Sequence, residues 1–270
     1  MRHQCKILGI NRSGLYYNKV EKDKILEEEI QAIYTLRPFY GYRRMAVELW
    51  RCFRKKVNKK RVLRIMQKLG LHAIYPKKPN LSKAVKEHKK YPYLLKGLKI
   101  ERVNQVWEAD ITYIKVKGST VYLVAIIDVY SRKILSFRLS NTMDKSFCIA
   151  ALNEALLRYG SPEIFNTDQG SQFTSNEFLE ILKKRKDIKI SMDSKGRALD
   201  NIYIERAWRS LKYENIYLND YKDMKECKEG IKRYFEFYNR KGWHQGIGYR
   251  TPYEVYFEGL KLVKGLNEAC

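Results

Sequence analysis

Residues 106–140 read VWEADITYIKVKGSTVYLVAIIDVYSRKILSFRLS, and they contain three apolar runs rich in β-branched and aromatic residues. Such runs are typical of β-strands, which we expect over 106–116, 120–128 and 134–140. The polar breaks between the runs are too short for a helical crossover. The three strands are therefore predicted to form an antiparallel meander, and the rest of the chain must extend or cover that sheet.

The segment after the meander alternates helix and strand. A helix through Tyr159, capped by Thr142 or Asp144 and ended by Gly160, precedes a short apolar strand, EIFN. A second helix (SNEFLEILKKRK), a strand (DIKISM) and a long helix (IYIERAWRSLKYEN) follow. A helical crossover returns the fourth strand parallel to an earlier one, most simply the first. The predicted fold class is α/β, with a mixed five-stranded sheet and flanking helices.

Three helices are expected before the sheet. The first covers 21–36, with early acidic residues and one apolar face, and the second covers 43–53. Asn58 can cap the third, KKRVLRIMQKLG, which stops at Gly70. In the second helix the side chains available for burial are Met45, Val47, Leu49 and Trp50. Two short helices, of which the second is basic, favour a small all-α helix-turn-helix domain that binds DNA, and a helical bundle with Lys and Arg for solubility is the alternative.

Positive charge gathers in the first part of the chain, which has a formal net charge of +24 as a whole. Through Val106 there are 27 Lys and Arg against 8 Asp and Glu, a net of +19, whereas the remainder has 27 against 22, a net of +5. A front half this basic favours a polyanionic partner, because each phosphate contact releases counterions. A basic surface that only keeps the chain soluble is the alternative. Residues 75–102 are Lys-rich with three prolines, and we interpret them as a basic linker that orders on DNA.

Several classes of protein are disfavoured by composition. No segment has the roughly 18 consecutive apolar residues of a membrane span, and the N-terminus lacks the apolar core of a secretory signal. The five cysteines are single and odd in number, which fits a reducing cytoplasm. The four histidines do not cluster with them, so no zinc site is expected. We therefore expect a cytoplasmic protein without membrane contact.

Three acidic residues form the candidate catalytic site. Asp110 lies inside the first strand, Asp168 follows the fourth, and Glu205 falls in the first turns of the last helix. If strands one and four are neighbours, the two aspartates converge and the helix brings Glu205 to them. Three carboxylates share a small space only when a cation neutralises them. Oxygen ligands and a phosphate substrate suit Mg²⁺ or Mn²⁺, and two such ions roughly 3.5–4 Å apart can serve a phosphodiester displacement.

Each of these acids also has a simpler interpretation. Asp110 can be a charge at a strand edge, although an acid inside so apolar a strand needs a partner. Asp168 can close an Asx turn, and Glu205 can pair with Arg209 one turn further along its helix. Lys212, seven residues after Glu205 on the same side of the helix, can contact a DNA phosphate or be solvated.

Three further acids are weaker candidates. Asp128 ends the second strand and is expected to pair with Arg132 or to close a turn. Glu108 is interpreted as an outward strand residue and Asp200 as a helix cap. None of these three belongs to the predicted catalytic set.

Five segments in the second part of the chain carry a family resemblance. In order, WEADITYI, AIIDVYSRKIL, NTDQGSQFTS, SMDSKGRALDNIYIER and YNRKGWHQGIGYRTPYEVY resemble the integrase-core transposases of bacterial insertion sequences, of the OrfB type made from two overlapping reading frames. ILGINRSGLYY, FYGYRRMAVELW and VNKKRVLRIMQKLGL resemble the helix-turn-helix region of the same family. The resemblance implies an RNase H-like core in which Asp110, Asp168 and Glu205 match the catalytic, metal-binding DDE triad. It also implies hydrolytic nicking that frees a 3′-hydroxyl, then strand transfer, without a covalent protein–DNA intermediate.

The resemblance also divides the chain and names its partners. Residues 1–74 correspond to the helix-turn-helix-like region, 75–102 to the basic linker, 103–215 to the integrase core and 216–270 to a helical extension of that core. The implied partners are double-stranded DNA (the terminal inverted repeats and the target), further copies of the chain in a synaptic complex, and an upstream OrfA-type product, all at the bacterial nucleoid. The residues expected to contact DNA are Lys59, Lys60, Arg61, Arg64, Lys68, Gln172 and Lys212.

Three features depart from the family pattern. The gap between Asp168 and Glu205 holds 36 residues, one more than is usual, and the extra residue is expected in 183–187. Asn166 stands where His is commoner, and Arg206 where Ser is frequent. None of these touches a triad carboxylate, so we expect a competent enzyme.

The C-terminal region has two features of its own. A helix that Asp223 can cap carries an apolar stripe that either packs against the core or dimerises, made of Met224, Cys227, Ile231, Tyr234 and Tyr238. A Gly-rich basic loop over 240–252 is expected to lie over DNA.

Two other functions remain open on the sequence alone. One is a metal-dependent nuclease on the same fold that cuts without joining. The other is a non-catalytic DNA-binding regulator that depends on the basic front half, and the intact triad weighs against it.

Overall fold

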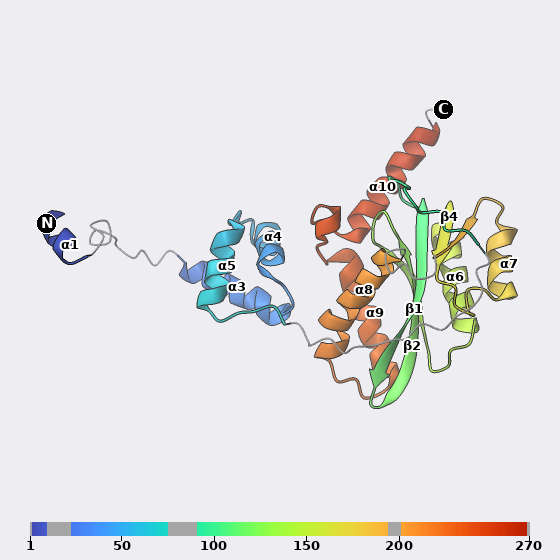
Figure 1. Cartoon of the computed structure of the whole chain (residues 1–270), viewed down its shortest axis with the longest axis horizontal. Helices are drawn as coiled ribbons and strands as arrows, with labels where there is room; N and C mark the ends of the chain where they lie inside the picture. Colours follow the sequence, from blue (N-terminus) through green and yellow to red (C-terminus); the bar gives the residue numbers. More distant parts are fainter. Residues whose placement is uncertain (1, 10–22, 75–90, 194–200, 269–270) are drawn as a thin grey trace. The chain divides into compact units, whose positions relative to one another are not determined.

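The computed structural model describes residues 2–9, 23–74, 91–193 and 201–268 of the chain, without the side chains of 2, 3, 6 and 263–268. The chain divides into two compact units, Met1–Ile74 and Tyr75–Cys270 (Figure 1). We call them the N-terminal unit and the C-terminal unit and describe each by itself.

The N-terminal unit is helical, with α1 (Arg2–Ile7), α3 (Lys24–Leu36), α4 (Tyr42–Phe53) and α5 (Lys59–Lys68). The Asn58 side chain accepts a hydrogen bond from the Lys60 N–H at 2.9 Å, so the predicted cap of α5 is confirmed. Gly70 follows α5 with a φ of +67°, a conformation that favours glycine after a helix. The buried core of α3, α4 and α5 consists of Leu26, Ile30, Ile33, Met45, Leu49, Val62, Ile65 and Met66.

The expected burial of Trp50 in α4 is wrong, because 47% of this residue is exposed. Glu48 lies inside instead, in the stripe that begins at Met45. Its carboxylate forms an ion pair with Arg37, and the Cys52 thiol donates to it at 3.2 Å. The buried face of α4 therefore includes position 48 and not position 50, and the ion pair with Arg37 neutralises the carboxylate that is buried there.

The C-terminal unit is built on a five-stranded sheet of order β3-β2-β1-β4-β5. The strands β1 (Val106–Val116), β2 (Ser119–Asp128) and β3 (Ile134–Ser140) form the predicted antiparallel meander. Lys117 and Gly118 both have positive φ, as a tight two-residue hairpin requires. The short strands β4 (Ile164–Thr167) and β5 (Lys189–Met192) are parallel to β1, with β4 paired to it as expected. This mixed topology confirms the RNase H-like fold.

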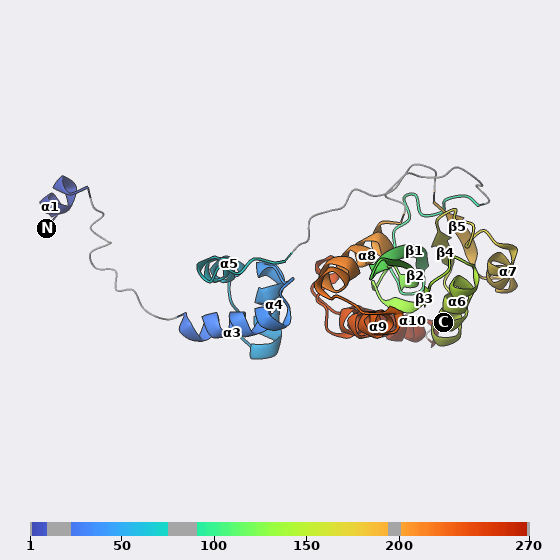
Figure 2. The same cartoon turned by 90° about the horizontal axis from the view of Figure 1, so that it is seen from below.

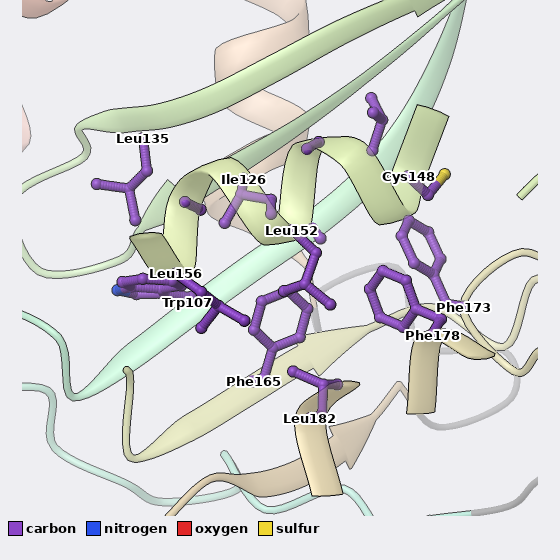
Figure 3. Close-up of a cluster of buried hydrophobic side chains, with 14 of the residues drawn as sticks. Trp107, Ile126, Leu135, Cys148, Leu152, Leu156, Phe165, Phe173, Phe178 and Leu182 are labelled. Carbon is purple, nitrogen blue, oxygen red and sulfur yellow. The ribbon is translucent and has the colours of Figure 1, made fainter. Parts of the chain in front are cut away.

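Helices cover both faces of the sheet, with α8 and α9 on one side and α6 and α7 on the other (Figures 1 and 2). Their bounds are α6 (Ser146–Tyr159), α7 (Asn176–Lys184), α8 (Ile202–Glu214), α9 (Met224–Arg240) and α10 (Pro252–Glu268). Two short 3₁₀ turns connect the last three helices: η1 (Ile216–Leu218) lies between α8 and α9, and η2 (Gln245–Ile247) lies between α9 and α10. Figure 3 shows the core beneath α6, where the Trp107 and Phe165 rings of adjacent strands lie close to Leu152 and Leu156.

The opposite face of the sheet packs against α8 and α9. The α9 stripe is buried there at Cys227, Ile231, Tyr234 and Tyr238, so its use in core packing is confirmed. The Asp223 carboxylate accepts from the Glu226 N–H at 2.8 Å and caps α9 as predicted.

Residues 91–102 differ from the linker that the sequence suggests. The Leu94 N–H donates to the Ser191 hydroxyl at 3.0 Å, and Leu95 and Ile100 pack around the buried Val106 and Ile164. This stretch is therefore part of the C-terminal unit, and it lacks periodicity because its contacts are irregular. The rest of the expected linker, 75–90, lies outside the described residues.

Gly230 in α9 gives a prediction for stability. A Cβ atom at this position would lie 2.1 Å from the hydroxyl of the buried Tyr221, which donates to the Asn215 side chain at 2.9 Å. We expect Gly230→Ala to lower the free energy of unfolding by about 1–3 kcal/mol, because overpacking outweighs the better helix propensity of alanine. Urea denaturation measures this, with Gly246→Ala as control, since a Cβ there meets nothing within 4 Å. Equal losses in both variants would contradict the prediction.

Candidate active site

The pairing of β1 with β4 brings the first two predicted catalytic acids together. The parallel register pairs Glu108 with Asn166 and Ala109 with Thr167. The next position on each side is Asp110 and Asp168, so the aspartates fall beside each other on the sheet face that carries α8.

The pKa of Asp110 shows that negative charge is concentrated around the two aspartates. Burial and, after it, the nearby negative charges of Asp168 and Glu205 together raise the pKa of Asp110 to about 7. A hydrogen bond from the Trp208 indole N–H to Oδ2 at 2.9 Å acts in the opposite direction, since it stabilises the carboxylate. All three predicted acids therefore interact electrostatically at Asp110.

Asp168 lies at the end of β4, and burial raises its pKa. The Gly170 N–H donates to Oδ1 at 2.9 Å, which is the Asx turn that the sequence also allowed. A Cβ atom at Gly170 would lie 2.9 Å from the same oxygen. The turn therefore holds the carboxylate in place, and glycine leaves it room.

Glu205 is exposed on the first turn of α8, and partial burial raises its pKa. No ion pair between Glu205 and Arg209 occurs in the part of the chain that the structure describes; the Arg209 guanidinium lies 5.5 Å from the centre of the Tyr213 ring instead. The surface-bridge interpretation of Glu205 is therefore wrong.

The three acids do not form a closed cage. Across the described residues, no three His, Cys, Asp or Glu side chains stand close enough to hold a metal ion. The structure thus brings Asp110 and Asp168 together and leaves Glu205 at the rim, on a helix beside them.

Two other predicted residues lie near these acids. Lys212 is half-buried on α8, its ammonium 5.1 Å from the centre of the Tyr113 ring. Burial lowers its pKa, and the charge of Asp110 opposes that change. Lys212 is therefore not simply solvated. Gln172 donates from Nε2 to the Met143 carbonyl at 2.9 Å, so it is held over the loop before α6.

In the N-terminal unit, α5 presents the predicted basic face, but Asp23, directly before α3, and Glu27, in its first turn, contact part of it. Arg61 and Arg64 both form ion pairs with Asp23, at 2.5 and 2.9 Å, and Lys68 pairs with Glu27 at 2.5 Å. Hydrogen bonding from Arg61 lowers the pKa of Asp23. The remaining members of the face, Lys59 and Lys60, are exposed. Sequence reasoning assigned the early acids of α3 only to the helix dipole.

Glu108 is the main functional side chain that the sequence reasoning placed incorrectly. It is buried, not outward, and its Oε2 accepts from the Ile204 N–H at 3.1 Å. Burial raises its pKa to about 8. The spacing in the sequence could have indicated this burial. Residues 108 and 110 are two apart in one strand, so Glu108 lies on the same face of the sheet as Asp110.

The remaining weak candidates have structural roles or lie outside the described residues. Asp128 accepts from the Ser131 N–H and hydroxyl, at 2.9 and 2.6 Å, so the expected turn is confirmed. Arg132 stacks at 3.6 Å on the Tyr203 ring. Asp200 lies outside the described residues.

Comparison with known proteins identifies the family. The integrase core domain family matches residues 100–198 and 186–252, and the HTH-like domain family matches residues 21–79. The chain is 32% identical over 254 residues to the putative transposase InsK of insertion sequence element IS150 from Escherichia coli K12, covering 91% of this chain and 89% of InsK. This chain belongs to the insertion-sequence transposases. It is also 33% identical over 247 residues to the transposase of insertion sequence element IS904 from Lactococcus lactis, covering 87% and 94% of the two chains.

Among solved structures, this transposase resembles the HTLV-2 integrase catalytic core domain in complex with magnesium. The TM-score is 0.47 and the identity 24%, over 57% of this chain and 96% of that domain.

The expected enzyme class follows from membership of the family. The chain is a DNA transposase of the DDE type, a polynucleotidyl transferase with an integrase core and a helix-turn-helix-like domain. The nuclease-only and regulator alternatives are not favoured. In the described residues, no helix of this transposase is both long enough and apolar enough to cross a membrane.

Proposed function

We propose that the transposase cuts and joins DNA strands at Asp110, Asp168 and Glu205, which hold one or two Mg²⁺ or Mn²⁺ ions. The observation that carries this proposal is the pair of half-buried aspartates that the adjacent parallel strands β1 and β4 bring together, where burial and the charge of Asp168 raise the pKa of Asp110. A protein gains nothing from holding two like charges together unless a cation neutralises them.

The donor chemistry fits these ions. Carboxylate oxygens are the protein ligands that Mg²⁺ and Mn²⁺ prefer. Glu205 is exposed on the helix beside the aspartates, and its charge raises the pKa of Asp110, so we assign it as the third ligand. When bound, the ions activate the attacking oxygen and stabilise the departing one.

The chain's own residues prepare the site. The Trp208 N–H orients Asp110, and the Gly170 N–H orients Asp168, so neither carboxylate has to be ordered when substrate arrives. The Lys212 ammonium, held against Tyr113, is placed to attract a phosphate toward the acids.

The proposed substrate is double-stranded DNA, both the inverted repeats at the element's ends and the target. The basic region 1–74 supplies recognition, and residues 103–215, extended by the helices of 216–270, supply catalysis. Contacts to phosphates are assigned to Lys59, Lys60, Arg61, Arg64 and Lys68, and near the acids to Gln172 and Lys212. Joining two ends requires further copies of the chain, and an upstream OrfA-type product is the proposed partner in that complex.

An assay of both products tests the function. The chain is incubated with a labelled duplex ending in the element's inverted repeat, with Mg²⁺ or Mn²⁺, with and without the upstream frame's product. We expect nicked ends and joined strands, and EDTA is expected to abolish both. Hydrolysed ends without joined strands in either metal would favour the nuclease, and binding without cleavage would favour the regulator.

The ion pairs of α5 lead to a prediction for DNA affinity. Lys59→Ala with Lys60→Ala is expected to weaken binding uniformly across sequences and to reduce the salt slope of log K by about 1–2, because each lysine releases about one counterion. Asp23→Asn is expected to tighten binding several-fold at low salt, since it releases Arg61 and Arg64. Fluorescence anisotropy at several salt concentrations measures both effects. Weaker binding by Asp23→Asn would contradict this use of α5.

A further inference from the structure

We propose that Glu108 is a positioning residue, which places Glu205 by fixing the N-terminus of α8 to the strand that carries Asp110. The inference rests on the proposed function only in giving Glu205 its catalytic role. The attachment of α8 is a property of the folded chain and can be measured without DNA or metal.

The helix is fastened to β1 on both sides of Glu205. Before it, the Ile204 N–H donates to Glu108 Oε2 at 3.1 Å. After it, the Trp208 indole N–H donates to Asp110 Oδ2 at 2.9 Å. Both acceptors lie on one face of one strand, two residues apart, so the helix turn that carries Glu205 cannot move along β1 without breaking one of these bonds.

A buried polar row extends this attachment across the sheet. Glu108, Asn166 and Ser191 are partners in register on β1, β4 and β5, and each is at most 1% exposed. The Ser191 hydroxyl donates to Asn166 Oδ1 at 2.7 Å, and Asn166 Nδ2 lies 3.4 Å from the Asn201 side-chain oxygen. Asn201 is the residue directly before α8. The start of the helix is therefore connected to two neighbouring strands.

Stability alone does not explain a glutamate at this position. Buried parallel strands are normally apolar on both faces, and the second oxygen of Glu108, Oε1, is buried without a hydrogen-bond partner among the described residues. A buried acceptor without a partner costs free energy, whereas an apolar side chain would not. The other oxygen does what an apolar residue cannot, because it satisfies a first-turn N–H of α8, which has no partner within the helix.

Two variants separate the reach of the acceptor from its ability to ionise. Glu108→Gln keeps an oxygen at the same distance and cannot ionise. Glu108→Asp keeps the carboxylate and withdraws it by one methylene, beyond reach of the Ile204 N–H. Amide hydrogen exchange in the first turn of α8 is then measured on the full chain without DNA or metal. We expect exchange about tenfold faster in the Asp variant, in line with the loss of a buried hydrogen bond, and near-wild-type exchange in the Gln variant.

A functional readout tests the link to Glu205. Binding of Mn²⁺, followed by Trp fluorescence because Trp208 contacts Asp110, is expected to weaken about tenfold in Glu108→Asp and to be restored largely by Glu108→Gln. In a Glu205→Ala background, Glu108→Asp is expected to add nothing further, since a positioning residue acts through the group it places. If the Asp variant does not fold, Glu108→Thr, which suits a strand and lacks the carboxylate, replaces it.

The outcomes are distinct. Unchanged exchange in α8 overturns the inference, and so does faster exchange with unchanged Mn²⁺ affinity. An equal loss of Mn²⁺ affinity in the Glu205→Ala background also overturns it. A wild-type chain that binds no Mn²⁺ and joins no DNA contradicts the proposed function instead, and hydrogen exchange then still decides whether Glu108 holds α8.

Discussion

Asp168→Ala is expected to lower the rates of nicking and of strand transfer by a factor of at least about 10³. The affinity for DNA is expected to change by less than about twofold. The physical reason is that one of two adjacent, half-buried carboxylates is lost, and with it the charge that attracts a divalent ion to the site. The stabilisation that such an ion gives a phosphoryl transition state is several kcal/mol, which corresponds to this loss of rate. Gel analysis of end cleavage and joining measures the rate, and anisotropy measures binding.

Asp187→Ala is the matched control, because Asp187 is an exposed aspartate in the turn before β5. We expect this variant to cut and join at the wild-type rate. Joining by Asp168→Ala at more than a few per cent of the wild-type rate would show that Asp168 is only the residue of an Asx turn.

Asp110→Asn is expected to remove activity and at the same time to stabilise the metal-free protein at pH 8, by about 2–4 kcal/mol. Burial and neighbouring negative charge raise the pKa of Asp110 to about 7, from an ordinary value near 3.8. The folded state therefore holds the proton over a range of pH in which the unfolded state has lost it. Stability falls as the pH rises from about 4 to about 7, and above 7 the full cost of the buried charge is present. Asparagine carries no charge and still accepts a hydrogen bond from Trp208. The stability of the Asp110→Asn variant therefore does not show this decrease between pH 4 and pH 7.

Urea unfolding from pH 4 to pH 8 without metal measures the effect, with Asp187→Asn as a control that is expected to match the wild type at every pH. Added Mn²⁺ is expected to stabilise the wild type at pH 8 and to stabilise Asp110→Asn far less, because the neutral amide oxygen binds the ion much more weakly than the carboxylate. A wild-type protein whose stability does not decrease between pH 4 and pH 7 would contradict the assigned environment of Asp110.

The strands and most helices could be predicted because their signals are local. The runs in 106–140 are β-branched and apolar, and the meander follows from the short breaks between them. The pairing of β4 with β1 was expected because a helical crossover returns a strand parallel to an earlier one, most simply the first. The proposed triad could be selected for the same reason, since this topology brings Asp110 and Asp168 to one face of the sheet, beside the helix that carries Glu205.

The interpretation of Glu108 failed because its neighbours come from elsewhere in the chain. Alternation within β1 places it on the same face as Asp110, but whether that face meets solvent or α8 depends on a helix 96 residues away. The expectation for Trp50 failed for a similar reason, since the face of α4 that is buried depends on α3 and α5, and that face carries Glu48, whose charge Arg37 neutralises.

The sequence by itself determined the order of the elements, the fold class and the set of candidate acids, because hydrophobic period, caps and turn residues act over a few positions. Only the tertiary structure decided which acid faces which helix and which basic side chains are paired. Asp23 reaches Arg61 and Arg64 across 38 and 41 residues, and Glu108 reaches the start of α8 across 96. Such contacts depend on the angle and register at which elements pack, and those are set by the whole core and not by any short segment.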